Sequence, residues 1–238
     1  MIPGLVSVTF RHLTPAEVVA LAVEAGLAAV EWAADAHVPV GELGNARQVA
    51  SLCADNGIGI EAYGSYYRAD GDFEPVLATA LALGATRIRV WAGRSGADWY
   101  DTVDDLRRVS ALAGAEGVEI AVEHHAGTLT GTLASALDLY YDVPSLRPYW
   151  QPPIGCSDEE ALGQLDALSP VTAHVFSWAA DGTRLPLAAR ESLWRPALAR
   201  LAALPGDRHA LLEFVRDDSP TAFLRDAATL RDWLAAPG

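Results

Sequence analysis

The feature that most constrains the fold is a regular alternation of short β-rich runs with segments of helical apolar spacing. An eightfold alternation within one chain of this length predicts an α/β fold, a (β/α)8 TIM barrel forming a single domain over residues 1–238. An open doubly wound sheet would also alternate, but its Gly-rich phosphate turn after the first strand is absent. The eight expected strands are Leu5–Phe10, Ala28–Trp32, Ile58–Tyr63, Arg87–Trp91, Val118–Glu123, Arg147–Gln151, Val171–Phe176 and Ala210–Val215.

Helix start and stop signals support this division of the chain. Thr14 with Pro15 and Glu17 forms a capping box, and the helix that it opens is expected to end at Gly26. The other expected starts are Thr102 with Asp105, Ser157 with Glu160, and Ser219-Pro220, the last opening a helix that runs to about Leu234; the expected ends are Asn56-Gly57, Gly84 and Gly117.

Composition excludes several classes of function. All 17 basic residues are arginine, so Schiff-base aldolases, pyridoxal-phosphate enzymes and Walker-A phosphate loops, which all need lysine, are ruled out. The formal net charge of −14 argues against nucleic acid and anionic membranes as partners. Cys53 and Cys156 are far apart and form no disulfide framework. With no signal peptide and no long apolar run at hand, we expect a cytoplasmic protein.

Ligand-capable side chains end four consecutive expected strands. Catalytic groups of a barrel gather at the carboxyl ends of its strands, so Glu123, Gln151, His174 and Glu213 should meet at one mouth. Three oxygen donors and one imidazole suit a divalent cation, Mn2+ or Mg2+ before Co2+ or Zn2+. The alternative is structural: Arg87 and Arg89 share one face of the fourth strand and could pair with these acids instead.

Further polar and aromatic residues fall on the same expected face. His125 points the same way as Glu123, and with Arg89 it is expected to hold substrate oxygens. His37 and Arg68, in loops, are expected to touch substrate. Tyr66 and Trp91 belong to a group of aromatic residues at the strand ends, which suits the apolar C–H faces of a sugar or simply plugs the barrel mouth.

In this order, one motif per strand end, the chain resembles the xylose isomerase-like barrel superfamily, in its sugar phosphate isomerase/epimerase branch. The motifs that carry the resemblance are Glu31-Trp32 with His37, Tyr63-Gly64-Ser65-Tyr66-Tyr67-Arg68, Arg89-Val90-Trp91-Ala92-Gly93, Glu123-His124-His125, Tyr149-Trp150-Gln151-Pro152, Ala173-His174-Val175 and Leu212-Glu213-Phe214. The resemblance implies a metal held by Glu123, Gln151, His174 and Glu213, with Gln151 replacing the usual Asp. It also implies that Glu123 and Glu213 exchange protons with the substrate.

We therefore expect a metal-dependent isomerase or epimerase that acts on a ketose or related polyol by abstracting a proton next to a metal-bound carbonyl. Two alternatives stay open: a dehydratase of a cyclic polyol ketone of the inosose type, and a non-catalytic sugar-binding barrel. The three-zinc DNA-repair endonucleases of the superfamily need more histidines and a basic DNA-binding face. The expected partner is a small sugar or polyol, and the sequence leaves open whether the chain forms a homo-oligomer.

Overall fold

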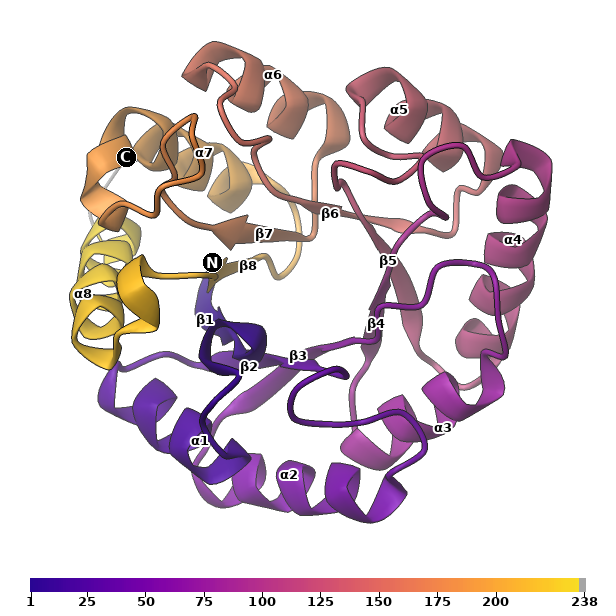
Figure 1. Cartoon of the computed structure of the whole chain (residues 1–238), viewed down its shortest axis with the longest axis horizontal. Coiled ribbons are helices and arrows are strands. Elements are labelled where there is room, and N and C mark those ends of the chain that lie inside the picture. The colour runs from indigo at the N-terminus through magenta and orange to yellow at the C-terminus, as the bar shows by residue number, and fades with distance from the viewer. Residues whose placement is uncertain (236–238) are drawn as a thin grey trace.

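The computed structural model describes residues 1–235 and contains one closed barrel of eight parallel strands in sequential order (Figure 1). The strands are β1 Ile2–Val6, β2 Ala29–Ala33, β3 Gly59–Gly64, β4 Arg87–Val90, β5 Glu119–Glu123, β6 Arg147–Trp150, β7 Thr172–Val175 and β8 His209–Leu212. The barrel closes where β8 pairs with β1. The sequence-based prediction of a (β/α)8 TIM barrel is therefore confirmed.

One helix follows each strand, and together the helices form a ring around the barrel in Figure 1. The helices are α1 Pro15–Glu24, α2 Leu43–Asp55, α3 Glu74–Leu83, α4 Trp99–Ala115, α5 Leu133–Asp142, α6 Asp158–Leu168, α7 Glu191–Ala203 and α8 Pro220–Ala235. Short 3-10 turns lie at Ser7–Phe10, Leu187–Arg190 and Arg216–Asp218. None of the helices within residues 1–235 is long and apolar enough to cross a membrane.

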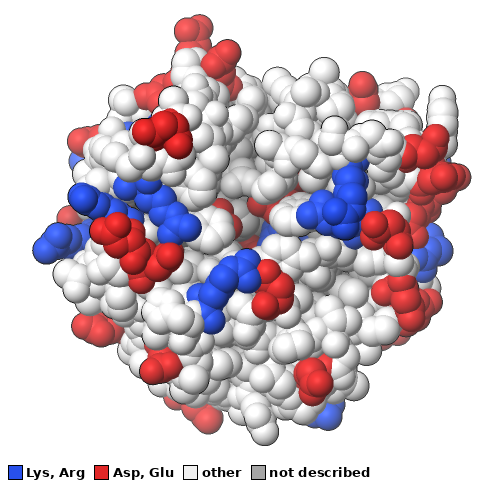
Figure 2. Space-filling model, in the orientation of Figure 1, with Lys and Arg blue, Asp and Glu red and all other residues white. Residues whose placement is uncertain are grey.

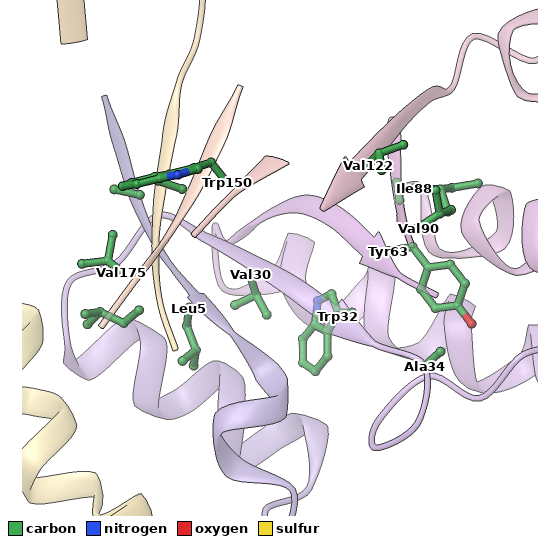
Figure 3. Packing of buried hydrophobic residues seen from close by; sticks show 14 of the residues in the cluster. Leu5, Val30, Trp32, Ala34, Tyr63, Ile88, Val90, Val122, Trp150 and Val175 are labelled. Carbon is green, nitrogen blue, oxygen red and sulfur yellow. The ribbon is translucent and has the colours of Figure 1, made fainter. Parts of the chain in front are cut away.

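Two apolar clusters hold the layers together. The larger lies between the sheet and the helices and includes Val30, Trp32, Ile88 and Trp150, which point outward from their strands (Figure 3). A smaller cluster fills part of the barrel interior, with Val6, Val8, Ala33, Ala121, Tyr149, Val171 and Leu211. Alternate residues of a strand face opposite sides of the sheet, so strands such as β1, β2, β5 and β8 supply both clusters.

Most of the expected helix caps are confirmed. Thr14 and Ser157 each form the full capping box, with Glu17 and Glu160. Three expectations were wrong. The eighth strand ends at Leu212 and not at Val215. The first strand ends at Val6 and not at Phe10, because residues 7–10 turn into a 3-10 helix. Helix α4 begins at Trp99 with Asp98 as its N-cap, so Thr102 lies inside the helix and donates to the Asp98 carbonyl oxygen.

Candidate active site

A cavity of about 300 Å3 opens at the carboxyl ends of the strands. It is the central hollow of the face shown in Figure 2, where basic and acidic side chains surround a mostly uncharged rim. Its lining includes Glu123, Gln151 and Glu213, together with Tyr66, Arg89, Trp91, His125, Phe176, Trp178 and Phe214. The cavity thus lies on the face at which the catalytic groups of a barrel usually gather.

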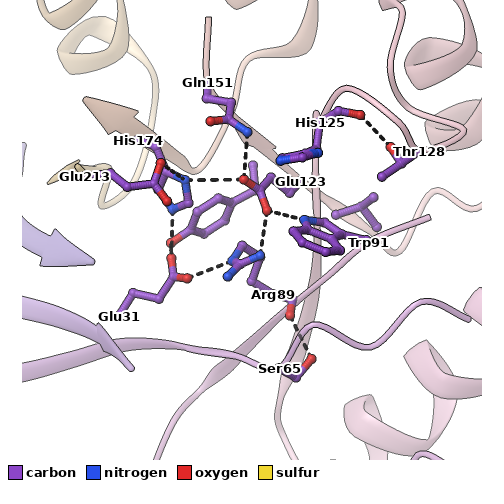
Figure 4. A network of polar contacts seen from close by, with 12 residues as sticks. Glu31, Ser65, Arg89, Trp91, Glu123, His125, Thr128, Gln151, His174 and Glu213 are labelled. Carbon is purple, nitrogen blue, oxygen red and sulfur yellow. Dashed lines mark hydrogen bonds and ion pairs between the residues drawn. The ribbon is translucent and has the colours of Figure 1, made fainter. Parts of the chain in front are cut away.

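The four expected ligands do come together at the floor of this cavity (Figure 4). His174 is fully buried, and its Nδ1 lies 3.5 Å from Glu123 Oε1 and 3.3 Å from Glu213 Oε2. The Gln151 amide donates to Glu123 Oε1 at 2.9 Å. These contacts join the ends of β5, β6, β7 and β8, which are neighbours in the barrel.

Glu31, in the middle of β2, fixes the orientation of the His174 ring from below. Nε2 of His174 lies 2.9 Å from Glu31 Oε2 and donates to that carboxylate. Nδ1 consequently faces the cavity floor, where it has no hydrogen-bond partner among the described residues. With Nε2 engaged by Glu31, Nδ1 is the ring nitrogen that faces Glu123 and Glu213.

Arg89 connects the two sides of this network. Its Nε donates to Glu31 Oε1 at 2.7 Å and its Nη1 donates to Glu123 Oε2 at 2.6 Å. The Trp91 indole N–H also donates to Glu123 Oε2. Gly64 makes room for the pair, because a Cβ there would lie 2.5 Å from Glu31 Oε1 and 2.8 Å from Arg89 Nη2. The arginine pairing that the sequence left as an alternative therefore occurs at Arg89, alongside the gathering of the four expected ligands.

The charges of the network shift several pKa values. Burial alone would raise the pKa of Glu31, but the neighbouring Arg89 and His174 lower it to about 2. The pKa of Glu123 is likewise lowered, because Arg89 and His174 outweigh the effect of burial. Burial would lower the pKa of His174, but Glu213 and Glu31 raise it well above its usual range. Glu31 and Glu123 are thus anionic at neutral pH.

Of the six residues expected to bind substrate, five lie at or beside the cavity. Tyr66, Arg89, Trp91 and His125 line the cavity. Arg68 stacks on Trp91, with its guanidinium carbon 4.0 Å from the ring centroid, and is not among the lining residues.

His37 requires a correction, because it is buried away from the cavity. Its ring contacts the Ser7 hydroxyl and the carbonyl oxygens of Phe10 and Leu13 at 3.0–3.2 Å, which connects the loop after β2 to the loop after β1. Its role in this structure is to hold these two loops together.

We compared the chain with protein-family models, curated proteins and solved structures. No protein-family model matches the chain, and no curated protein matches it. Solved structures match along nearly the whole chain, among them several xylose isomerase domain proteins. This chain has the xylose isomerase-like TIM-barrel fold.

Three of these structures illustrate the range of proteins with this fold. The probable 3-DHS dehydratase AsbF involved in petrobactin synthesis, from Bacillus anthracis, has a TM-score of 0.81 and 19% identity, covering 97% of this chain and 99% of that one. A D-allulose 3-epimerase from Methylomonas sp. has a TM-score of 0.68 and 12% identity, covering 98% and 97%. A xylose isomerase-like TIM barrel protein from Mycobacterium smegmatis, in complex with magnesium, has a TM-score of 0.66 and 16% identity, covering 98% of each chain.

Within this xylose isomerase-like barrel, sequence reasoning missed several residues of the site. Glu31 was noted at a strand end but was given no role, and its position beneath His174 depends on a contact between residues 143 positions apart. Arg11 lines the cavity and pairs with Asp35 at 2.6 Å. Phe176 and Phe214 also line it, and their places one residue after β7 and two residues after β8 were the signal that could have identified them.

The donor set of the floor is suited to a divalent cation. As the side chains stand, no three His, Cys, Asp or Glu residues within 1–235 form a group that could hold a metal ion. The Glu123 carboxylate is already held by Arg89, Trp91 and Gln151. Turning the Gln151 amide would point its oxygen at the floor and free Glu123 Oε1. Nδ1 of His174 is already in place, but the raised pKa of this histidine keeps a proton on it at neutral pH. The residues therefore fit an ion once this hydrogen bond is exchanged and the proton of His174 is released.

Proposed function

We propose that the chain is an enzyme that transfers a proton next to the carbonyl of a small polyhydroxylated ketone, as an isomerase or epimerase of a ketose or related polyol. The observation that carries this proposal is the position of Glu123 and Glu213, which lie 3.5 and 3.3 Å from Nδ1 of the buried His174 at the cavity floor. Two carboxylates beside one fixed imidazole are the groups that general acid–base chemistry requires.

Each residue of the floor has a distinct task in this scheme. Glu123 is anionic at neutral pH, since Arg89 and His174 lower its pKa despite burial, and it can accept a proton at Oε1 once the Gln151 amide turns away. Glu213 has no hydrogen bond to its carboxylate within residues 1–235, so it is free to approach the substrate from the β8 side. One glutamate removes the proton and the other returns it, either to the opposite face for epimerisation or to the adjacent carbon for isomerisation.

Glu123, His174, Glu213 and the Gln151 amide oxygen are the residues that would hold a divalent cation, Mn2+ or Mg2+ before Co2+ or Zn2+. When bound, such an ion supplies Lewis-acid stabilisation of the negative charge that develops on the substrate oxygen. Gln151 contributes no charge, so two carboxylates alone would balance the ion. Support for an ion also comes from the magnesium complex of the Mycobacterium smegmatis barrel.

A dehydratase is the second candidate, supported by the likeness to the probable dehydratase from Bacillus anthracis, which has a TM-score of 0.81. The first step would be the same proton removal by a floor glutamate. The hydroxyl on the next carbon would then leave with a proton as water, and a carbon–carbon double bond would form. The two reactions differ in product, because only dehydration releases water from the substrate.

The test combines metal binding with proton exchange. The purified protein is treated with a chelator, its melting temperature is measured, and Mn2+, Mg2+, Co2+ or Zn2+ is added back. We expect saturating metal to raise the melting temperature by about 5–10 °C, because an ion that binds only the folded state stabilises it. In D2O, a panel of ketoses and inososes is then followed for deuterium at the carbon next to the carbonyl, and chromatography separates isomerisation from dehydration.

Two histidine variants provide the comparison. His174→Ala should abolish the metal-dependent shift, whereas His209→Ala, whose histidine lies at the other end of the barrel, should retain it. Identical melting with and without every metal, together with no deuterium incorporation for any compound, would leave only the sugar-binding barrel and would overturn the proposal.

A further inference from the structure

A line of buried polar contacts runs through the barrel interior from the cavity floor to the amino-terminal end. Nε2 of His174 donates to Glu31 Oε2 at 2.9 Å, and the same carboxylate oxygen lies 2.5 Å from the Tyr149 hydroxyl. That hydroxyl also lies 2.6 Å from Glu61 Oε2. All four side chains are buried. Residues of β7, β2, β6 and β3 thus form one continuous path between the two ends of the barrel.

The Tyr149 hydroxyl contacts two carboxylates but has only one proton to donate. Arg89 pairs with Glu31 and Arg87 pairs with Glu61, so a guanidinium balances each carboxylate and both act as acceptors. The proton of the hydroxyl can therefore point to Glu31 or to Glu61, and it satisfies one contact at a time. The two orientations differ in how firmly Glu31 is held.

Tyr149 also contacts His174 through its aromatic ring. The two ring centroids are 5.0 Å apart, and the rings meet edge to face at an interplanar angle of 77°. The tyrosine therefore fixes the imidazole twice, because its ring packs against it and its hydroxyl holds the Glu31 carboxylate that engages Nε2. Since the imidazole is rigid, the direction of Nε2 determines where Nδ1 lies relative to Glu123 and Glu213.

Glu61 reaches the Tyr149 hydroxyl from an end of the barrel that lies close to solvent. Its Oε1 accepts from Arg87 at 2.5 Å and from Thr172 at 2.6 Å, and it lies 3.7 Å from His209 Nδ1. The side chains of Arg87 and His209 are 13% and 14% exposed, whereas the Glu61 side chain is fully buried. The Glu61 carboxylate is thus held at the amino-terminal end, and Tyr149 is its contact toward the floor.

We propose that Tyr149 is a positioning residue of the active site, whose hydroxyl couples Glu61 at the amino-terminal end to the orientation of His174 at the floor. With its proton directed to Glu31, the hydroxyl holds that carboxylate in place beneath Nε2; with its proton directed to Glu61, it releases Glu31. These orientations are the two-state element that coupling between distant groups requires. The inference rests on the proposed function, because it assigns how the imidazole of that site is held.

The first test removes the hydroxyl and keeps the ring. Tyr149→Phe should move the imidazole nitrogen resonances of His174 in NMR spectra of the metal-free protein, where they are assigned by their loss in His174→Ala. In a calorimetric titration, Mn2+ affinity should fall by about tenfold, because partners that orient a metal-binding histidine have effects of this size. Tyr140→Phe is the matched control. The Tyr140 hydroxyl donates to the Val122 carbonyl oxygen at 2.9 Å, outside the polar line, so neither readout should change.

The second test asks whether Glu61 acts through Tyr149. In Glu61→Gln the amide oxygen can still accept from the two donors at Oε1, and the amide N–H can donate to the Tyr149 oxygen, so the hydroxyl proton is directed to Glu31. This variant should move the His174 resonances and raise Mn2+ affinity by about two- to threefold, although within residues 1–235 no hydrogen bond or ion pair joins Glu61 directly to His174. Neither effect should occur when the substitution is made in the Tyr149→Phe protein.

Glu119→Ala is the control at the amino-terminal end, because it removes another partner of Arg87 and should leave the His174 resonances in place. The coupling is overturned if Tyr149→Phe leaves these resonances unchanged, or if Glu61→Gln moves them equally with and without the hydroxyl. Should Tyr149→Phe fail to fold, unchanged resonances in Glu61→Gln alone would overturn it. If the resonances respond as expected but the wild type binds no metal and exchanges no deuterium, the coupling stands and the proposed function is overturned.

Discussion

The two ends of the barrel interior both hold buried carboxylates, but they use them differently. At the amino-terminal end, Glu61 Oε1 accepts from Arg87 at 2.5 Å and from Thr172 at 2.6 Å, while Oε2 contacts the Tyr149 hydroxyl at 2.6 Å. At the mouth, the Glu213 carboxylate has no hydrogen bond within residues 1–235, and it lies beside an unpartnered nitrogen of His174.

The number of hydrogen bonds that each carboxylate accepts distinguishes a structural role from a possible role in binding or catalysis. A carboxylate whose oxygens are all engaged holds strands together, because removing it leaves buried donors without partners. A carboxylate with free lone pairs at the floor of a cavity has capacity left for a substrate or an ion. The Tyr149 hydroxyl connects the two ends, since it also contacts Glu31 Oε2 at 2.5 Å.

The largest expected effect is on turnover, from Glu213→Gln. The substitution keeps the size of the side chain but removes the basic carboxylate, so turnover on an identified substrate should fall by about 10²- to 10⁴-fold. Glu123→Gln should show a similar loss. Glu213→Gln also removes the ion pair with Nδ1 of the buried His174, so the melting temperature of this variant should fall below that of the wild type. A metal-loaded Glu213→Gln protein with near-normal turnover would falsify the two-glutamate mechanism.

The next largest effect is on stability, from Glu61→Leu at the opposite end. Arg87, Thr172 and Tyr149 would lose a buried partner, and the free energy of unfolding should fall by about 3 kcal/mol in a urea titration. Glu119→Ala is the control, because Glu119 pairs with Arg87 and Arg147 at a half-exposed position and should cost less than about 1 kcal/mol. Equal losses for the two variants would contradict the comparison.

A smaller effect is expected from Glu31→Gln, which acts through His174. The amide is a weaker acceptor for His174 Nε2, and it removes one of the two negative charges that balance Arg89. The Mn2+ affinity measured by calorimetry should therefore fall by about 10- to 100-fold. Glu119→Ala should leave Mn2+ affinity unchanged, since that residue is remote from the floor. Unchanged affinity in Glu31→Gln would show that Glu31 is only a structural partner of Arg89.

The smallest effect concerns pH and His37, which lies outside the floor. Burial lowers the pKa of His37, although hydrogen bonds to backbone carbonyl oxygens oppose the shift. A histidine with a lowered folded-state pKa contributes stability that is present above pH 6.5 and is lost as the pH falls below it. Between pH 7.5 and 5.5, the wild type should therefore lose about 2 °C more in melting temperature than His37→Gln. Parallel pH profiles would contradict this.

Much of the fold could be predicted from the sequence because its signals are local. Apolar periodicity and capping residues such as Thr14 and Ser157 act within a few residues, so the eight strands and most helix ends follow from neighbouring positions. The meeting of Glu123, Gln151, His174 and Glu213 could also be predicted, because parallel strands in a barrel bring their carboxyl ends to one side.

What the sequence could not show depends on contacts across the barrel. The pairing of β2 with β3 shifts by one residue after Val30. Glu61 faces the barrel interior, where it contacts Tyr149, and strict alternation along β3 could not have predicted this because the alternation does not include the shift. Glu31 lies beneath His174, and Arg89 pairs with Glu123. Both contacts join residues that meet only when the strands close into a barrel.

The backbone of Tyr66 and Phe214, which has positive φ at both residues, shows the same division most clearly. Sequence alone indicates positive φ at Gly, Asn or Asp, and nothing at Tyr66 or Phe214 indicates it. Their conformations are imposed by neighbouring loops, such as the bond from Phe214 to Thr9, between residues 205 positions apart. The sequence by itself determined the barrel and the end of it at which the four predicted ligands meet. Only the tertiary structure decided which buried groups are satisfied and which remain free, because hydrogen-bond partners distant in sequence meet only in the closed barrel.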